Sequence, residues 1–104
     1  MAFFGVKGNP ISDATGEALM ADSDARRFAH DTVTTDAGPV KVSTMFIPDD
    51  MRSAQDVEDG LPPLIFETAA LLGSDEVAIE RRSTGDEAIR AHLDVLGRIQ
   101  GGRP

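Results

Sequence analysis

Alternating apolar and polar positions run through the middle of the chain and predict four β-strands. Residues 26–35 are rich in β-branched side chains, which favour strands. Residues 40–47 alternate with a period of two, and the break at residues 36–39 predicts a hairpin turn between the two runs. Residues 64–72 form the strongest apolar run and predict a central strand, and residues 76–82 alternate as a half-exposed strand does.

Two further segments have the pattern of helices. Thr84 followed by Glu87 matches a capping box, in which the threonine hydroxyl accepts the amide of the third helical residue. We expect this helix to run to about Gln100. Its predicted apolar stripe consists of Ile89, His92, Leu93, Leu96 and Ile99. A shorter helix is predicted from Ser12 or Asp13 to about residue 20.

Together these elements predict an α+β fold. Short sequential connections favour an antiparallel four-stranded meander, and the C-terminal amphipathic helix can cover one face of that sheet. A length of 104 residues indicates one domain, residues 1–104. Residues 26–100 form its predicted sheet-plus-helix core. Residues 1–25 are a poorly specified segment with a short strand or helix, and residues 101–104 a frayed tail. Residues 48–60 read as an exposed loop with one helical turn begun by Asp49 or Asp50.

Composition narrows the functional classes. The chain has 18 acidic and 10 basic residues, a net charge of −8, which disfavours binding to a phosphate backbone. It has no cysteine, so thiolate chemistry is excluded and a reducing cytoplasm is favoured. It shows no signal-peptide pattern and no apolar run long enough to span a bilayer. We therefore expect a cytoplasmic protein that binds neither membrane nor nucleic acid directly. Aromatic residues are few, and Phe28, Phe46 and Phe66 are assigned to the core.

Three titratable residues are candidates for chemistry. Glu67 interrupts the most apolar strand and His92 lies on the helix stripe, so the two could act as acid and base if they shared a pocket. We favour structural roles: Glu67 exposed or paired with Arg81 or Arg82 on the next strand, and His92 partly buried with one hydrogen bond. His30, Glu67 and His92 could form a two-histidine, one-carboxylate metal site, but they lack ligand spacing. No metal or cofactor is expected.

Half of the net charge lies in one segment. Residues 49–59 carry five acids and one base, a net charge of −4. The acidic residues are Asp49, Asp50, Asp56, Glu58 and Asp59. They lack the pattern of a calcium loop. A dense carboxylate surface can imitate a phosphate array and bind a basic surface of another protein. The alternative is that the charge only keeps a small protein soluble.

Two blocks carry a resemblance to known sequences: V-S-T-M-F at residues 42–46 and P-P-L-I-F-E-T at residues 62–68. Over about residues 30–95 the chain resembles a group of short proteins of actinobacteria and their phages, which have V-S-T-V-x-L-x-L-D-H and P-x-L-F-E-T-M blocks and a later Gly-His. Ala91-His92 stands at that Gly-His position. The family's L-D-H is replaced by residues 47–50, without the histidine, and the methionine after F-E-T by Ala69. The resemblance implies a shared fold and origin but no mechanism.

The sequence thus favours a small acidic, non-enzymatic accessory protein that acts by protein–protein contact. No nucleophile motif, metal spacing or phosphate loop points to an enzyme. A phage setting, which the resemblance implies, would suit an inhibitor or nucleic-acid mimic. The alternatives are a small enzyme or metal-binding domain using Glu67 and His92, and a homodimer that pairs through an exposed sheet face or edge strand.

Overall fold

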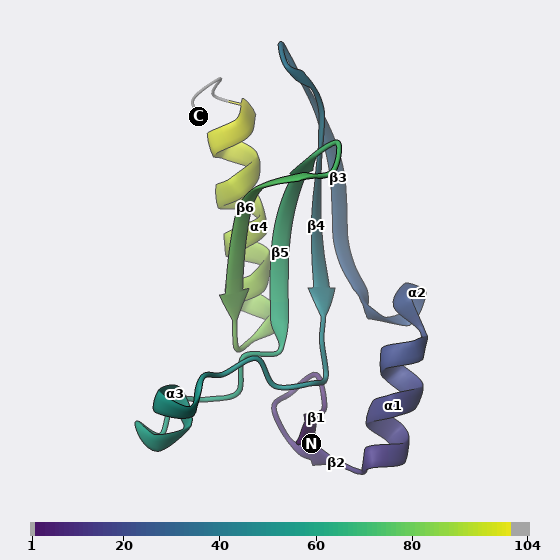
Figure 1. Ribbon diagram of the computed structural model, residues 1–104, viewed down its shortest axis with the longest axis vertical. Helices are drawn as coiled ribbons and strands as arrows, with labels where there is room; N and C mark the ends of the chain where they lie inside the picture. Colours follow the sequence, from purple (N-terminus) through teal and green to yellow (C-terminus); the bar gives the residue numbers. More distant parts are fainter. Residues whose placement is uncertain (1, 101–104) are drawn as a thin grey trace.

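A computed structural model describes residues 2–100, so the predicted C-terminal tail lies outside the described residues. Figure 1 shows two parts, a tall sheet backed by a helix and a lower group of short elements. The elements in chain order are β1 (Phe3–Phe4), β2 (Pro10–Ile11), α1 (Asp13–Ala21), α2 (Ser23–Arg26), β3 (Arg27–Thr35), β4 (Gly38–Phe46), α3 (Ala54–Glu58), β5 (Phe66–Leu72), β6 (Asp75–Arg82) and α4 (Gly85–Gln100). We call β3–β6 with α4 the body, and residues 2–26 with residues 47–65 the base.

The sheet of the body is the predicted antiparallel meander, with strand order β3-β4-β5-β6. Its register places Asp31, Val42 and Ala70 side by side across the first three strands. Tight turns join the strands of each hairpin. Gly38 and Gly73 there have φ of 125° and 63°, values that favour glycine because it has no Cβ. The α+β prediction is confirmed.

Two boundaries differ from the sequence prediction by more than fraying. β5 begins at Phe66 rather than at Leu64, because the Leu64 amide donates to the Asp50 carboxylate instead of a neighbouring strand. The helical turn predicted from Asp49 or Asp50 begins instead at Ala54, after Ser53. Asp50 also explains this difference, because its carboxylate accepts hydrogen bonds from Arg52 and Leu64 and is not available to cap a helix.

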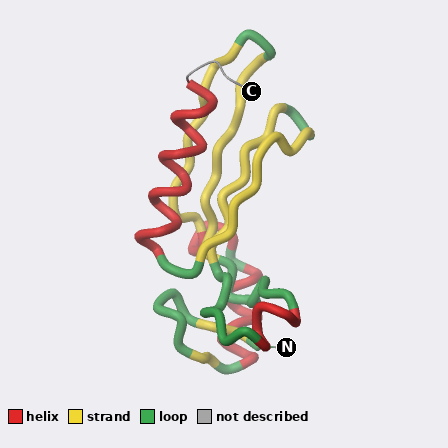
Figure 2. The backbone as a smooth tube through the Cα atoms, turned by 90° about the vertical axis from the view of Figure 1, so that its left-hand side faces the viewer, coloured by secondary structure: helices red, strands yellow, loops and turns green. Residues whose placement is uncertain are grey.

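α4 covers one face of the sheet and leaves the other open, as Figure 2 shows from the side. The buried apolar side chains between helix and sheet form two clusters: Val40, Val42, Ala70 and Val95, and Phe46, Ile65, Phe66 and Ala88. Phe28 is 40% exposed, which corrects its assignment to the core. Its ring packs against Phe66 in a tilted arrangement with 5.1 Å between centroids, but β3 is an edge strand, so the ring is partly open to solvent.

The predicted apolar stripe of α4 is partly wrong. His92 is buried, but Ile89 and Leu93 are exposed, and the remaining buried positions are Ala88, Ala91 and Val95. The predicted stripe consisted mainly of large apolar side chains and left out the alanines. The small side chains of Ala88 and Ala91 let the helix lie close to the sheet, and this close packing determines which side of α4 faces inward. Thr84 accepts the Glu87 amide as predicted, at 3.2 Å.

The base is held by a few specific contacts. The buried Phe3 ring lies on Gly16 of α1, where a Cβ atom would stand 2.1 Å from the ring. The Phe4 amide donates to the Pro48 carbonyl, which joins the N-terminal residues to the strand exit of β4. Within residues 2–100, no helix is both long and apolar enough to cross a membrane.

Candidate functional site

A chain of hydrogen bonds runs from the centre of the sheet to its edge. The hydroxyl oxygens of Thr44 and Thr68 lie 2.6 Å apart, on neighbouring strands at directly opposed positions. Nδ1 of His92 lies 2.7 Å from the Thr44 hydroxyl, and Nε2 lies 2.7 Å from a carboxylate oxygen of Asp31. We call Thr68, Thr44, His92 and Asp31 the polar chain. Three strand residues and one helix residue, up to 61 positions apart, meet there.

The donor and acceptor inventory fixes the direction of these bonds. An ionised Asp31 carboxylate only accepts, so His92 donates from Nε2. In a neutral ring Nδ1 then accepts from the Thr44 hydroxyl, and Thr44 in turn accepts from Thr68. Every donor in the polar chain has an acceptor in this arrangement. Among the described residues, no buried side-chain nitrogen or oxygen lacks a partner.

The order carboxylate, imidazole, hydroxyl is that of an acid–base–nucleophile triad, but access rules this use out. Thr44 is 0% exposed and Thr68 is also buried, so an external substrate cannot reach either hydroxyl. Asp31 is the one member that meets solvent, with 52% of its side chain exposed. The polar chain therefore fixes the position of α4 on the sheet rather than attacking a substrate.

Glu67 and His92 do not share a pocket. Glu67 lies on the open face of the sheet, where its carboxylate pairs with Arg81 at 3.1 Å, as one of the structural alternatives predicted. His92 lies against the other face, beneath α4. His30 is exposed on β3 opposite Ser43, on the same open face as Glu67. The enzyme or metal site built on Glu67 and His92, with or without His30, is thus contradicted by the geometry.

The described residues also provide no other obvious metal centre. No three or more histidine, aspartate or glutamate side chains within residues 2–100 are grouped so that they could hold a metal ion. The chemistry that the described residues display to solvent is therefore charge and apolar surface. The net negative charge is concentrated in the base, whereas exposed apolar side chains occur on both parts.

Asp50 is the internal anchor of the acidic segment. One carboxylate oxygen accepts the amides of Arg52 and Leu64 at 3.0 and 3.1 Å, and the other accepts Nε of Arg52 at 2.6 Å. Burial raises the pKa of Asp50, but the hydrogen bonds from Arg52 and Leu64 and the charge of Arg52 together lower it below its usual value. Only 11% of this side chain is exposed, so Asp50 holds the loop and does not face a partner.

The other predicted acidic residues are arranged around α3. Asp56 closes a capping box with Ser53, and Asp59 accepts from Gln55 at 2.9 Å on the exposed side of the turn. Glu58 is exposed at the end of α3, and Asp49 is half-buried beside β1. The sequence predicted all five on one solvated loop. In the structure Asp50 is largely buried, Asp56 and Asp59 form hydrogen bonds in the α3 turn, Asp49 is half-buried and Glu58 is exposed.

Apolar side chains accompany the acids. Val57 is 52% exposed and Leu61 is 48% exposed, and both belong to the turn that displays Glu58 and Asp59. A hollow of about 190 Å³ lies next to them. Its lining residues are Arg52, Asp56, Leu61, Pro62, Leu64 and Ser83. The segment is thus a mixed apolar and acidic projection, which its charge pattern alone did not reveal.

The polar chain is the feature that sequence reasoning missed. The alternation of residues 40–47 puts Thr44 on the same face as Val42 and Phe46, and in the structure Thr68 lies directly opposite it on the next strand. Two adjacent polar residues on an apolar face must find partners, and His92 on the covering helix was the available one. Asp31 could not be found this way, because strand 26–35 shows no clear alternation.

Comparison of the chain with protein-family models, with curated proteins and with solved structures finds no match. The functional argument therefore depends on the geometry and charge described above.

Proposed function

We propose that the protein is a small acidic, non-enzymatic interaction protein that binds a basic surface of a partner protein through residues 49–59. One observation carries the proposal. α3 stands out from the base (Figure 1), and Val57, Glu58 and the C-cap Asp59 at its C-terminal end are all exposed, so apolar and acidic side chains meet solvent together.

The projection is held rigidly, which favours recognition. Ser53 and Asp56 cap α3 reciprocally, and Arg52 donates from its guanidinium to the Leu61 carbonyl at 2.6 Å, so both ends of the loop are tied to one another. Asp50 ties the same loop to the start of β5 through Leu64. A surface that is already ordered loses less conformational entropy on binding than a flexible acidic tail does.

The mixed chemistry favours a protein over a metal ion as the ligand. Protein interfaces have an apolar centre and a polar rim, and the arrangement around Val57 and Leu61 has that composition. The carboxylates at the rim would steer a basic partner and set the orientation in which it binds. A partner that normally holds a phosphate backbone would present such a basic surface.

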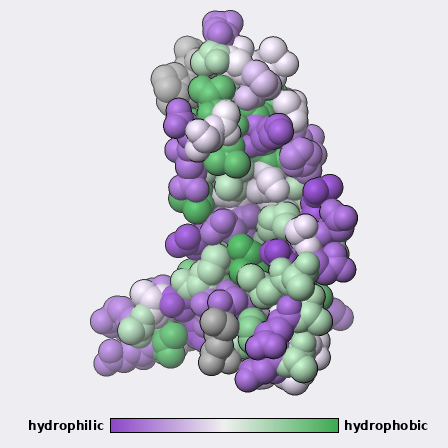
Figure 3. All heavy atoms as spheres, turned by 45° about the vertical axis from the view of Figure 1, so that its right-hand side comes forward, coloured by the Kyte–Doolittle hydropathy of each residue, from purple (hydrophilic) through white to green (hydrophobic). Residues whose placement is uncertain are grey.

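The charge distribution of the whole base also favours a basic partner. The base contains nine acidic residues and three basic ones, Lys7, Arg26 and Arg52. The Arg26 guanidinium donates hydrogen bonds to the carbonyls of Leu19, Met20 and Phe46. The Arg52 guanidinium donates to the Asp50 carboxylate and the Leu61 carbonyl. Both guanidinium groups are therefore engaged in hydrogen bonds within the protein, and the acidic residues of the base outnumber its basic ones. Figure 3 shows hydrophilic side chains on the lower part of the molecule interspersed with hydrophobic ones, and further hydrophilic side chains along the sheet above it.

The cytoplasmic setting and an origin among actinobacteria or their phages belong to this proposal. The absence of cysteine supports a reducing compartment. The resemblance of residues 42–46 and 62–68 supports the origin, and in a phage the partner would be a host protein that handles nucleic acid.

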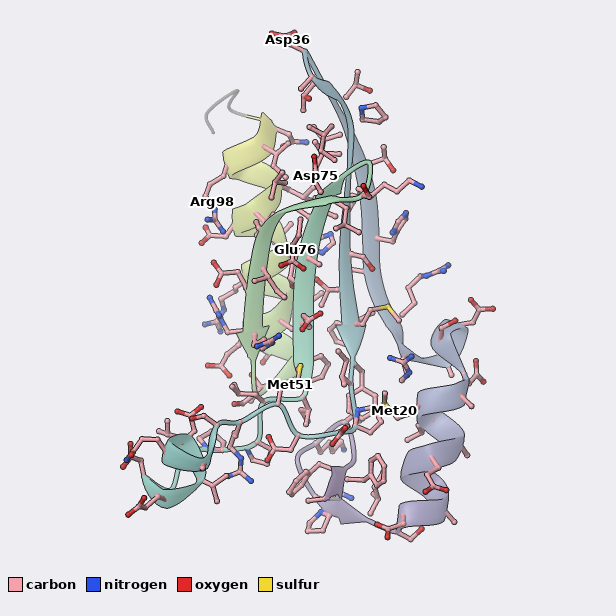
Figure 4. The ribbon with its side chains drawn as sticks, in the orientation of Figure 1. Met20, Asp36, Met51, Asp75, Glu76 and Arg98 are labelled. Carbon is pink, nitrogen blue, oxygen red and sulfur yellow. The ribbon has the colours of Figure 1, made fainter. Side chains whose placement is uncertain are left out.

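The test compares two variants with the same change in charge. Glu58→Gln with Asp59→Asn removes two outward carboxylates from α3, whereas Glu17→Gln with Asp36→Asn removes two from α1 and from the distant β3–β4 turn (Asp36 in Figure 4). Tagged wild-type and variant proteins capture partners from a host lysate, and the bound proteins are quantified by mass spectrometry.

We expect basic proteins that the wild type enriches to be lost at least about tenfold with the α3 variant and kept by the control variant. Capture that survives the α3 changes would overturn the proposal. So would equal loss with both variants, because that result would show a general charge effect. Circular dichroism establishes that both variants are folded.

A further inference from the structure

The open face of the sheet consists of three rows of side chains that cross all four strands, each with one residue from β3, β4, β5 and β6 in turn. The rows are Arg27, Met45, Glu67 and Arg81; His30, Ser43, Ala69 and Ile79; and Thr32, Lys41, Leu71 and Glu76. We call them the first, middle and third rows. No element covers them in the side view of Figure 2.

The charge of this face differs from that of the whole molecule. Its charged side chains are three basic and two acidic, Arg27, Lys41, Arg81, Glu67 and Glu76. They sum to +1 on a chain whose net charge is −8. Another copy of this acidic chain is therefore repelled less at the open face than the net charge implies, and is attracted to it if the charges fall in register.

The apolar residues lie where an interface needs them. Met45, Ala69 and Leu71 are half-buried on the two central strands, and Ile79 is 39% exposed beside Ala69. The charged residues of the first and third rows flank this apolar centre, which is the composition of a protein interface. The middle row contains Ser43 and Ala69, whose small side chains allow close approach.

We propose that the open face is a dimer interface for a second copy of this chain, with a two-fold axis along the middle row. This axis lays the first row of one copy over the third row of the other. Arg81 of each copy then faces Glu76 of the second copy, which gives two ion pairs by symmetry. The opposite choice of axis, along the strands, would place Arg27 against Arg81 and is disfavoured by like charge.

Shape and area agree with this arrangement. The β5–β6 hairpin leans away from α4 (Figure 2), and Glu76 lies near its tip (Figure 4), so this carboxylate stands forward to meet another molecule. Four strands about 4.8 Å apart and about 25 Å long give a footprint of roughly 500 Å² per copy. The total of about 1,000 Å² is the lower limit for a specific interface, so we expect a weak dimer.

The experiment is sedimentation equilibrium over a range of protein concentrations, compared with the chain mass of 11.1 kDa. The wild type should approach twice that mass at high concentration. Arg81→Glu or Glu76→Arg alone should raise the dimer dissociation constant at least about tenfold, because each places like charges together. The double variant reverses both ion pairs and should restore the dimer.

Arg90→Glu on the exposed side of α4 is the matched control, and it should leave the dimer intact. A wild type that stays monomeric at every concentration would overturn the proposal. Single variants that still dimerise, or a double variant that does not recover while folded by circular dichroism, would also overturn it. Loss of the dimer with Arg90→Glu but not with Arg81→Glu would move the interface to the outer side of α4. Changes at Glu58 and Asp59 should not affect dimerisation, so this result is independent of partner capture.

Discussion

The body and the base are stabilised in different ways. In the body, apolar side chains from the sheet and α4 form two buried clusters, and the polar chain lies between them with its hydrogen bonds matched. In the base, Phe4, Leu19 and Ile65 contribute to the nearer of these clusters, and the remaining order depends on single contacts such as Phe3 on Gly16 and Asp50 with Arg52. The body therefore resists change as a unit, whereas the base can be altered locally.

The difference also separates stability from recognition. Between the sheet and α4, His92 has a hydrogen-bond partner at each ring nitrogen, and Asp31 is the member of the polar chain that meets solvent. The base buries little and displays acidic and apolar groups together. The body thus contains most of the buried interior, whereas the base depends more on individual polar contacts, and three changes can test that difference.

The largest effect is expected for His92→Ala. The change leaves a cavity beneath α4 and deprives the buried Thr44 hydroxyl of its acceptor, so we expect the free energy of unfolding to fall by about 3 kcal/mol. Urea denaturation followed by circular dichroism measures it. His30→Ala, which truncates an exposed histidine on the open face, should change stability by less than about 0.5 kcal/mol. A loss below about 1 kcal/mol for His92→Ala would mean that the polar chain contributes little to the body.

An intermediate and local effect is expected for Asp50→Asn. Asparagine keeps an oxygen for the amides but loses the charge that holds Arg52, which should cost about 1–2 kcal/mol in the base only. Hydrogen exchange at the amides of Arg52 and Leu64 should accelerate while that of the body does not. Equal acceleration in both parts would show that body and base open together.

The lowered pKa of Asp50 adds a pH dependence to the same test. A carboxyl whose pKa is lower in the folded chain contributes its full stability above its ordinary value of 3.8 and loses it as the pH falls below that value. Protection of the Leu64 amide should therefore weaken in this acidic range in the wild type. In Asp50→Asn the protection should be low throughout and should not show that step.

The smallest net effect is expected for Gly16→Ala. A methyl group there overlaps the Phe3 ring, so the ring must leave its site, at a cost of about 2 kcal/mol in lost burial. Alanine offsets roughly 1 kcal/mol of this through its better helix propensity. We expect a net loss of about 1 kcal/mol, confined to α1 and β1, detected by proteolysis near residues 2–12. Unchanged protease resistance would show that Phe3 does not anchor the N-terminal residues.

The body was largely predictable from its sequence because its signals are local. Strand alternation, the turns at residues 36–39 and the Thr84 cap each act over a few residues, and the short connections leave few topologies. The side of α4 that faces the sheet was not predictable in the same way. It depends on how closely a helix can approach, and small residues such as Ala88 and Ala91 decide that while contributing little to a hydrophobic pattern.

The candidate site was less predictable because its contacts cross the fold. Asp50 and Leu64 are 14 residues apart within one irregular connection, and no periodic pattern predicts which of its amides a carboxylate meets. Glu67 and Arg81 are also 14 residues apart, but strand pairing places them directly opposite each other. Interactions within one hairpin can therefore be read from the chain, whereas those within an irregular connection need coordinates.

The strand order of the body also bears on how the chain folds. Each strand pairs with the one made just before it, so the sheet can assemble in the order of synthesis. The two hairpins close over tight turns, whereas pairing of β4 with β5 must close the longer connection of residues 47–65. The bond between Asp31 and His92 spans 61 residues and can form only when α4 arrives. That bond therefore marks completion: a ribosome-bound chain that ends before residue 92 has all four strands but leaves Thr44 and Thr68 without a cover.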